Sequence, residues 1–268
     1  MVNHVLSLKV KHPVAVGSIR FDQEHFPLIV GPCSLESNKQ VDHILATLND
    51  LNIHLMRGGI WKLRTNPSSF QGLGTDALPL IESIKRAGLF LVSEVTDPRH
   101  IEFLLPHVSV FQVGARNMYN YYLLKELAQT GKPVLLKRSF AATVDEWLKA
   151  ANYLLNGPCN HVILCERGIR TFEHGTRFTL DLNGALLAKA QSGLPVIVDP
   201  SHAIGLREFV PNLALAVAAS GLDGLIMEVH PEPDQALSDG RQSMTLQQLQ
   251  ELVPQLDMVL NISGRKRC

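Results

Sequence analysis

The stretch Ala77-Leu-Pro-Leu-Ile-Glu-Ser-Ile-Lys-Arg-Ala-Gly-Leu-Phe-Leu-Val-Ser-Glu-Val95 contains the two patterns that decide the fold. Its first half places apolar residues at i, i+3, i+4 and i+7, which is typical of one face of an α-helix. Its second half, residues 89–95, is a short apolar run typical of a strand buried on both faces of a parallel sheet. Gly88 stands between the halves, where a helix C-cap is expected. The stretch therefore predicts a helix that leads directly into a buried strand.

The same alternation runs through almost the whole chain. The predicted strands cover residues 27–33, 54–60, 89–95, 108–114, 133–137, 161–167, 195–199 and 224–229. Helical patterns include residues 41–48, 77–85 and 145–155, and glycines expected at helix ends are Gly88, Gly131, Gly157, Gly193 and Gly221. The length of 268 residues matches the roughly 250 residues of a (β/α)8 barrel. We predict an α/β fold, a (β/α)8 or TIM barrel, with an open doubly wound sheet as the alternative that counting strands leaves open.

Both ends of the chain lie outside the alternating pattern. The alternating residues Ser18-Ile-Arg-Phe-Asp22, within residues 11–26, predict a short β-hairpin that plugs the barrel. We therefore divide the chain into an N-terminal extension at 1–26, a catalytic barrel at 27–262 and a basic tail at 263–268. The tail is expected to be solvated and frayed. The N-terminal extension is too short to be a regulatory domain.

Composition excludes several classes of function. The 25 basic and 25 acidic residues cancel, which argues against nucleic acid and anionic membrane as partners. No run approaches the roughly 18 apolar residues of a membrane span, and the N-terminus does not resemble a secretory signal. The four cysteines include no C-x-x-C pair. A cytoplasmic protein is therefore expected.

Charged side chains gather where the predicted strands end. The active site of a (β/α)8 barrel lies at the C-terminal ends of its strands and in the loops that follow. A rim of arginine and lysine there would bind small polyanions such as phosphates and carboxylates. Each of these cations, taken alone, is also accounted for as an ordinary surface charge. The charged residues concerned are Arg57, Lys62, Glu94, Arg116, Lys137, Arg138 and Arg167.

A second group combines one thiol, one imidazole and two carboxylates. Cys33 follows the first predicted strand, His202 the seventh, and Glu228 and Asp239 the eighth. These strands are neighbours in a closed barrel, so the four side chains could surround one divalent ion of intermediate softness: manganese, iron, cobalt or zinc. Singly, a cysteine is more often a small buried hydrophobe, and the histidine has a similarly ordinary account.

Several phrases of the sequence resemble one enzyme family. They are Gly31-Pro-Cys-Ser-Leu-Glu-Ser, Arg57-Gly-Gly through Lys62-Leu-Arg-Thr, Ser69-Phe-Gln-Gly-Leu-Gly, Gln112-Val-Gly-Ala-Arg-Asn, Leu135-Leu-Lys-Arg, Ile163-Leu-Cys-Glu-Arg-Gly-Ile-Arg-Thr-Phe-Glu, Val198-Asp-Pro-Ser-His-Ala, Met227-Glu-Val-His-Pro and Ala236-Leu-Ser-Asp-Gly. Together they resemble 3-deoxy-D-arabino-heptulosonate 7-phosphate (DAHP) synthase, in the short subclass related to 3-deoxy-D-manno-octulosonate 8-phosphate synthase. The resemblance implies condensation of phosphoenolpyruvate with erythrose 4-phosphate, the first step of the shikimate pathway and so of aromatic amino acid biosynthesis.

The resemblance also implies roles for particular residues. Cys33, His202, Glu228 and Asp239 match the metal ligands, and Lys62, Cys33 and His202 are expected to take part in catalysis. The group that transfers protons stays open among Lys62, Glu94, His202 and a metal-bound water. The substrate-binding residues would be Arg57, Lys62, Arg64, Thr65, Glu94, Ala115, Arg116, Lys137 and Arg167. A homodimer or homotetramer is the habit of the family.

One departure affects the predicted aldose site. The family phrase Lys-Pro-Arg-Thr here reads Lys62-Leu63-Arg64-Thr65. Losing proline frees a backbone torsion, so the loop is expected to be less rigid. Within enzymes, the alternative is the eight-carbon synthase, which uses arabinose 5-phosphate. A non-catalytic phosphosugar-binding barrel and a synthase serving a specialised pathway are further alternatives.

Overall fold

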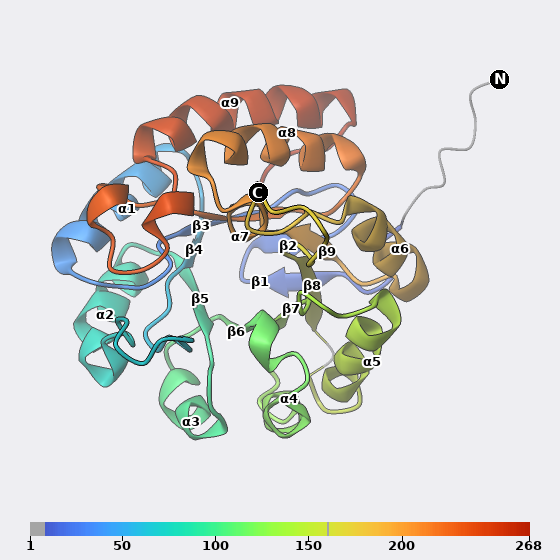
Figure 1. Cartoon of the computed structure of the whole chain (residues 1–268), viewed down its shortest axis with the longest axis horizontal. Coiled ribbons are helices and arrows are strands. Elements are labelled where there is room, and N and C mark those ends of the chain that lie inside the picture. The colour runs from blue at the N-terminus through green and yellow to red at the C-terminus, as the bar shows by residue number, and fades with distance from the viewer. Residues whose placement is uncertain (1–8, 160) are drawn as a thin grey trace.

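The protein forms a closed barrel of parallel strands surrounded by helices. The structure, a computed structural model, describes residues 9–159 and 161–268. Figure 1 shows the helices forming an outer ring around the strands. The eight barrel strands are β3 (Leu28–Gly31), β4 (Leu55–Arg57), β5 (Phe90–Glu94), β6 (Val110–Val113), β7 (Val134–Lys137), β8 (Val162–Glu166), β9 (Val196–Val198) and β10 (Leu225–Glu228).

Pairing between the first and last barrel strands decides between the two predicted architectures. Leu225 to Glu228 of β10 pair in parallel with Leu28 to Gly31 of β3, and each remaining strand pairs with its neighbours in chain order. An open sheet has no such pairing, so the predicted (β/α)8 barrel is confirmed and the open sheet is wrong. Each observed strand lies within its predicted range.

Helices connect the strands. They are α1 (Asn38–Asp50), α2 (Leu78–Arg86), α3 (Ile101–Leu104), α4 (Tyr121–Ala128), α5 (Val144–Leu155), α6 (Leu182–Ser192), α7 (Pro200–Ile204), α8 (Val210–Ser220) and α9 (Leu246–Ile262). Short 3-10 turns lie at Gly74–Ala77, Pro98–His100, Ala115–Asn117, Arg207–Phe209, Pro233–Gln235 and Gly240–Gln242. Among the described residues, no helix is long and apolar enough to cross a bilayer.

Four of the five glycines expected at helix ends have left-handed backbone there. Gly88, Gly131, Gly193 and Gly221 all have φ between 67° and 88°. Gly157 is the exception, because Asn156 is the C-cap of α5 and Gly157 does not have positive φ. A Cβ at Gly157 would lie 2.6 Å from the Ala128 Cβ, so glycine is required there for close packing instead.

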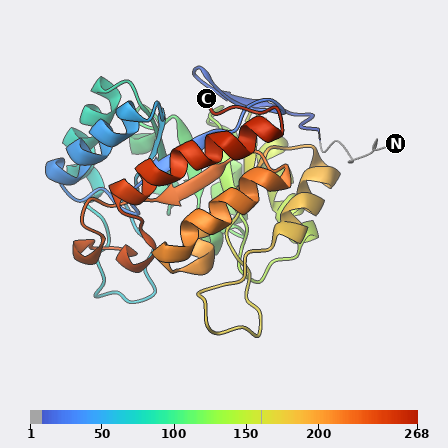
Figure 2. The same cartoon turned by 90° about the horizontal axis from the view of Figure 1, so that it is seen from above.

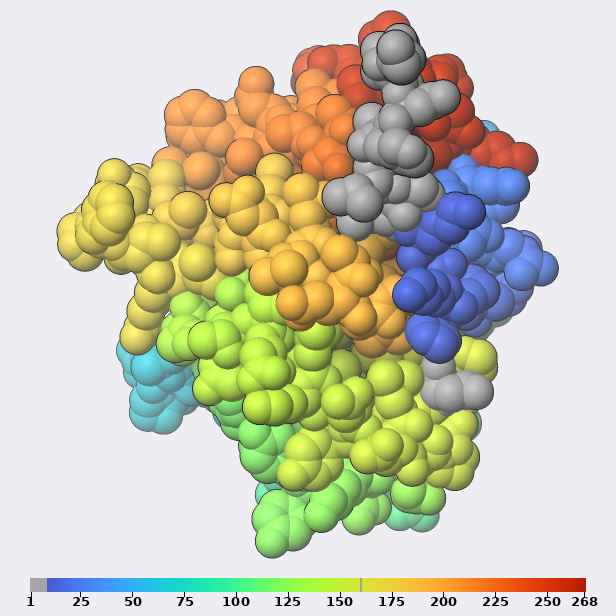
Figure 3. Space-filling model, turned by 90° about the vertical axis from the view of Figure 1, so that its right-hand side faces the viewer, coloured from blue at the N-terminus to red at the C-terminus, as the bar shows by residue number. Residues whose placement is uncertain are grey.

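The N-terminal hairpin closes one end of the barrel. Strand β1 (Val14–Val16) pairs antiparallel with β2 (Ile19–Phe21), as predicted. Four of its side chains pack in one cluster with inward-facing residues of the barrel: Val14, Val16, Ile19 and Phe21. Figure 2 shows the blue hairpin at one end of the barrel and the long loops after β4 (teal) and β8 (yellow) at the other. Figure 3 shows the same loop after β8 projecting from the edge away from the hairpin. Residues 1–8 of the predicted extension lie outside the described residues.

The C-terminal tail is not frayed, which corrects the expectation from sequence. Arg265 is 8% exposed and donates to the carbonyls of Leu222 and Ala218. Arg267 binds both carboxylate oxygens of Asp257 at 2.6 and 3.0 Å. The tail is ordered because its arginines bind carbonyl oxygens at and just beyond the C-terminal end of α8 and a carboxylate of α9.

Candidate active site

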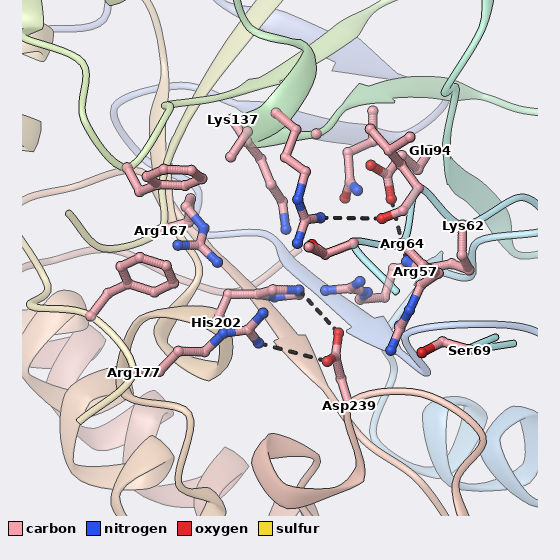
Figure 4. Close-up of a pocket in the computed structure, with 18 of the residues that line it drawn as sticks. Arg57, Lys62, Arg64, Ser69, Glu94, Lys137, Arg167, Arg177, His202 and Asp239 are labelled. Carbon is pink, nitrogen blue, oxygen red and sulfur yellow. Dashed lines mark hydrogen bonds and ion pairs between the residues drawn. The ribbon is translucent and has the colours of Figure 1, made fainter. Parts of the chain in front are cut away.

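A basic cavity opens at the C-terminal ends of the barrel strands, as the strand-end rule predicts. Its volume of about 290 Å³ suits small metabolites. Figure 4 shows the labelled side chains converging on it from different strands. All of the predicted substrate-binding residues line it: Arg57, Lys62, Arg64, Thr65, Glu94, Ala115, Arg116, Lys137 and Arg167.

Arg138 was grouped with this rim from sequence, and that grouping is wrong. Arg138 is buried, and its Nη1 lies 3.2 Å from Glu166 Oε2 and 2.8 Å from Asp181 Oδ2. It is not among the residues that line the cavity. Side chains alternate across a strand, so Lys137, the last residue of β7, and its neighbour Arg138 face different surroundings.

The four residues predicted to bind a metal come together at one side of the cavity. One possible ligand atom from each of Cys33, His202, Glu228 and Asp239 lies within 4.8 Å of the others. Cys33 Sγ lies 3.1 Å from Asp239 Oδ2, and His202 Nε2 lies 3.6 Å from Glu228 Oε1 and 3.8 Å from Asp239 Oδ2. Sulfur, nitrogen and two oxygens are a donor set that suits divalent manganese, iron, cobalt or zinc.

Two of these four side chains also have partners on the side that faces away from the cluster. His202 Nδ1 lies 2.8 Å from Asp199 Oδ2, and Glu228 Oε2 accepts a hydrogen bond from Gln242 Nε2 at 2.5 Å. Burial lowers the pKa of His202, against the attraction of Asp199, and so favours the neutral imidazole that binds metals. Within the described residues, Glu228 Oε1 is buried, accepts no hydrogen bond of good geometry, and lies 3.0 Å from Arg57 Nη2. The inward-facing atoms thus fit a cation.

The backbone at Asp239 is held in an uncommon conformation. Its φ is 52°, in the left-handed region that aspartate adopts more readily than most residues but still at a cost. Gly240 follows, and a Cβ there would lie 2.1 Å from the carbonyl oxygen of Pro233. The turn that aims Asp239 at the cluster therefore depends on this glycine.

Cations surround the rest of the cavity. Arg167 is 5% exposed, its Nη1 is buried without a hydrogen-bond partner among the described residues, and its guanidinium lies 4.3 Å from the centre of the Phe178 ring. Burial lowers the pKa of Arg167 to about 10, although Asp199 opposes the shift, and the side chain stays charged at neutral pH. A buried cation with unused donors is suited to an anionic ligand.

Lys62 and Glu94 form an ion pair between the cluster and the cations. Lys62 Nζ donates to Glu94 Oε2 at 3.3 Å and to the carbonyl of Cys33 at 3.2 Å. Burial opposes the charge on both residues. The pKa of Lys62 is nevertheless raised by Cys33 and Glu94, and the pKa of Glu94 is lowered by Lys62 and Lys137. Both groups are therefore charged at neutral pH.

The loop after β4 presents Arg64 and Thr65 to the cavity. Trp61 stacks on His100 at its base, with ring centroids 3.9 Å apart. Gly72 has φ 94°, and a Cβ there would lie 2.2 Å from the Ile60 carbonyl oxygen. The end of the loop therefore passes close to its beginning. Leu63, at the position of the family proline, is 40% exposed.

Four further residues belong to the site and were not singled out from sequence. Arg177 and Phe178 line the cavity from the loop after β8. Asp199 and Gln242 contact predicted ligands from behind. Arg177 follows the same strand as Arg167, which was a usable signal, whereas nothing in the sequence pattern marks Gln242.

Comparison with known proteins decides the family. A family model described as the DAHP synthetase I family matches residues 9–261. The chain belongs to this family. The phospho-2-dehydro-3-deoxyheptonate aldolase of Thermotoga maritima is 40% identical over 254 residues, which are 94% of this chain and 75% of that protein.

Solved structures agree with this membership. A crystal structure of phospho-2-dehydro-3-deoxyheptonate aldolase (DAHP synthase) from T. maritima has a TM-score of 0.91 and 39% identity, and the match covers 96% of this chain and 75% of that one. A truncated form of 3-deoxy-D-arabino-heptulosonate 7-phosphate synthase from T. maritima has a TM-score of 0.88, 36% identity and coverage of 96% and 94%. The 2-dehydro-3-deoxyphosphooctonate aldolase of Methylococcus capsulatus is 31% identical over 259 residues, 88% of this chain and 90% of that protein.

Proposed function

We propose that this protein is a DAHP synthase, which condenses phosphoenolpyruvate with erythrose 4-phosphate and releases inorganic phosphate. The observation that carries the proposal is that one cavity contains both a four-residue metal-ligand cluster and a wall of cations, of which Arg57, Lys137 and Arg167 are buried. A divalent ion held by the cluster would suit a carbonyl oxygen, and the cations suit phosphate and carboxylate groups. Membership of the DAHP synthetase I family supports the same assignment.

Phosphoenolpyruvate is assigned to the cationic wall. Arg116, Lys137 and Arg167 would hold its phosphate and carboxylate, with Arg57, Lys62 and Glu94 and the backbone at Ala115 nearby. Lys137 Nζ lies 2.5 Å from Asp199 Oδ2, which fixes its position before substrate arrives. Charges held in place in this way orient the substrate and stabilise charge that develops later.

Cys33, His202, Glu228 and Asp239 would hold one divalent ion of manganese, iron, cobalt or zinc. When bound, such an ion supplies Lewis acidity to the aldehyde oxygen of the aldose. The C2=C3 electron pair of phosphoenolpyruvate forms a bond from C3 to the aldehyde carbon as the aldehyde C=O π bond opens, the aldehyde oxygen takes up a proton, and positive charge develops at C2. Water adds at C2 and gives up a proton, and the bond from C2 to the phosphate oxygen then breaks with its electron pair leaving on inorganic phosphate. The charged Lys62–Glu94 pair lies beside this cluster and can hold or transfer a proton. Our proposed catalytic residues are Lys62, for this reason, and Cys33 and His202, because they would hold the ion.

The aldose phosphate is assigned to the loop after β4. Arg64 and Thr65 offer a guanidinium and a hydroxyl to its phosphate, and both line the cavity. The Arg-Thr pair favours erythrose 4-phosphate. The runner-up is the eight-carbon synthase that uses arabinose 5-phosphate, because an octonate aldolase is 31% identical to the chain. A homodimer or homotetramer stays a prediction, as does a cytoplasmic location.

Phosphate release measures the proposal directly. Metal-free protein is incubated with phosphoenolpyruvate, manganese is restored, and release is compared with erythrose 4-phosphate, arabinose 5-phosphate and no aldose. We expect release to need the metal and to be fastest with erythrose 4-phosphate. Faster release with arabinose 5-phosphate would move the chain to the sister enzyme, and no release with any aldose or metal would identify a non-catalytic barrel.

A further inference from the structure

Two of the proposed metal ligands share one outer support, formed by Arg177 and Gln242. Gln242 Nε2 donates to Glu228 Oε2 at 2.5 Å, and Arg177 Nη1 donates to Gln242 Oε1. The same Arg177 nitrogen lies 3.7 Å from Asp239 Oδ1. Figure 4 shows Asp239 between Arg177 and His202, with a dashed line to each. We name Arg177 and Gln242 the outer pair.

The outer pair has a fixed polarity. A guanidinium only donates hydrogen bonds, so the oxygen of the Gln242 amide must face Arg177 and its nitrogen must face Glu228. Gln242 is 3% exposed, so water does not replace these partners easily. If Arg177 were removed, the buried oxygen of the Gln242 amide would lose its donor, and only the bond to Glu228 would hold the amide in place.

This polarity selects which oxygen of each carboxylate faces the cluster. Oε2 of Glu228 is occupied by Gln242, which leaves Oε1 facing Arg57 Nη2 at 3.0 Å and His202 Nε2 at 3.6 Å. Oδ1 of Asp239 lies on the Arg177 side, which leaves Oδ2 facing Cys33 Sγ at 3.1 Å. Partners behind metal ligands of this kind typically change metal affinity or activity by about 10- to 100-fold when removed.

We propose that Arg177 and Gln242 are positioning residues that hold the Glu228 and Asp239 carboxylates for the divalent ion and so set the affinity of the site for it. The inference rests on the metal site assigned under the proposed function. The change in metal affinity that it predicts is opposite in sign to that of a simple charge effect. Removing a positive charge next to a cation site should tighten metal binding by Coulomb's law, whereas loss of carboxylate positioning should weaken it.

Binding of Mn²⁺ alone, measured by calorimetry without substrates, tests the inference. We expect Arg177→Met and Gln242→Met each to weaken Mn²⁺ binding by roughly 10- to 100-fold. The double variant should lose less Mn²⁺ affinity than the product of the two single effects, because Arg177 acts in part through Gln242. Arg241→Met and Gln250→Met, at exposed positions nearby, are the matched controls and should bind Mn²⁺ like the unaltered protein.

A spectroscopic measurement separates a loss of carboxylate positioning from a general loss of folded protein. With Co²⁺ in place of Mn²⁺, the visible absorption bands report the ligand geometry, and we expect them to shift in both outer-pair variants and not in the controls. Arg177 has a side chain that is 33% exposed, so Arg177→Met keeps the test available if Gln242→Met does not fold.

Equal or tighter Mn²⁺ binding by Arg177→Met, or unchanged Co²⁺ bands, would overturn the inference. Cys33→Ala is included to test the metal site itself. If Cys33→Ala bound Mn²⁺ like the unaltered protein, the proposed ligand set would be wrong. If Cys33→Ala lost binding while both outer-pair variants kept it, only the positioning role would be wrong.

Discussion

Asp199 Oδ2 lies 2.8 Å from His202 Nδ1 in a site where His202 Nε2 faces the other proposed metal ligands. Asp199 also caps α7 by accepting a hydrogen bond from the His202 backbone at 2.9 Å. The side chain and the backbone of one ligand are thus fixed by one carboxylate. Lys137 Nζ contacts the same carboxylate oxygen, so Asp199 connects the metal-ligand cluster to the cations proposed for phosphoenolpyruvate.

Asp199→Asn should therefore damage both halves of the site. We expect Mn²⁺ affinity to fall by roughly 10- to 100-fold, because an uncharged amide holds the His202 ring less strongly than a carboxylate does. KM for phosphoenolpyruvate should rise as well, because Lys137 loses its anionic partner. Calorimetry and steady-state kinetics measure the two effects. Asp234→Asn, at an exposed aspartate, is the control, and an equal loss in it would contradict a specific role for Asp199.

Arg167→Met should raise KM for phosphoenolpyruvate. Losing one hydrogen-bonded charge partner costs about 1.5–3 kcal/mol, which is roughly 10- to 150-fold in kcat/KM. Arg170→Met is a matched control, because Arg170 also stacks on a phenylalanine, 4.4 Å from the centre of the Phe140 ring, but is exposed and does not line the cavity. Similar kinetics in both variants would show that Arg167 does not bind this substrate.

Leu63→Pro should lower KM for erythrose 4-phosphate with little change in KM for phosphoenolpyruvate. Proline restricts the loop before substrate binds, so less conformational entropy is lost on binding. The carbonyl of Leu63 that accepts from Arg116 at 3.2 Å is retained. Leu63→Ala separates the effect of the ring from loss of the leucine side chain. An improvement with alanine equal to that with proline would contradict the entropic explanation.

Asp223→Ala should lower the free energy of unfolding, although Asp223 has no proposed role in the reaction. Asp223 accepts from Lys189 Nζ at 2.7 Å and from the Val196 backbone at 2.8 Å, and both side chains of the ion pair are 1% exposed. Removing one member of a buried pair leaves an uncompensated charge and costs about 3–5 kcal/mol. Urea unfolding measures the loss. The exposed pair Lys149–Asp145 provides the control, since Asp145→Ala should change stability little.

The barrel could be predicted from the sequence because strands buried on both faces are continuous apolar runs. Each observed strand, such as Val162–Glu166, falls inside such a run. Closure could not be read from any local pattern, because it depends on pairing between β10 and β3, which are far apart in the chain. The order of the C-terminal tail could not be predicted for the same reason, because Arg265 binds the carbonyls of Ala218 and Leu222, which lie far from it in the sequence.

The site was predictable to the extent that it follows the strand ends. Cys33 and Asp239 were placed together because their strands are neighbours in a closed barrel, and the structure brings them within hydrogen-bond distance. Asp199 and Gln242 were missed because they act on other side chains rather than on the cavity. Such contacts depend on loop geometry, which has no sequence period.

The mass of the product formed by the unaltered protein with Mn²⁺, phosphoenolpyruvate and erythrose 4-phosphate tests the central claim most directly. We predict a phosphorylated keto acid of seven carbons, formed together with inorganic phosphate, that is absent without the metal and absent with Cys33→Ala. A product of that mass formed equally well by metal-free protein or by Cys33→Ala would contradict the account, as would recovery of both substrates unchanged at every metal concentration.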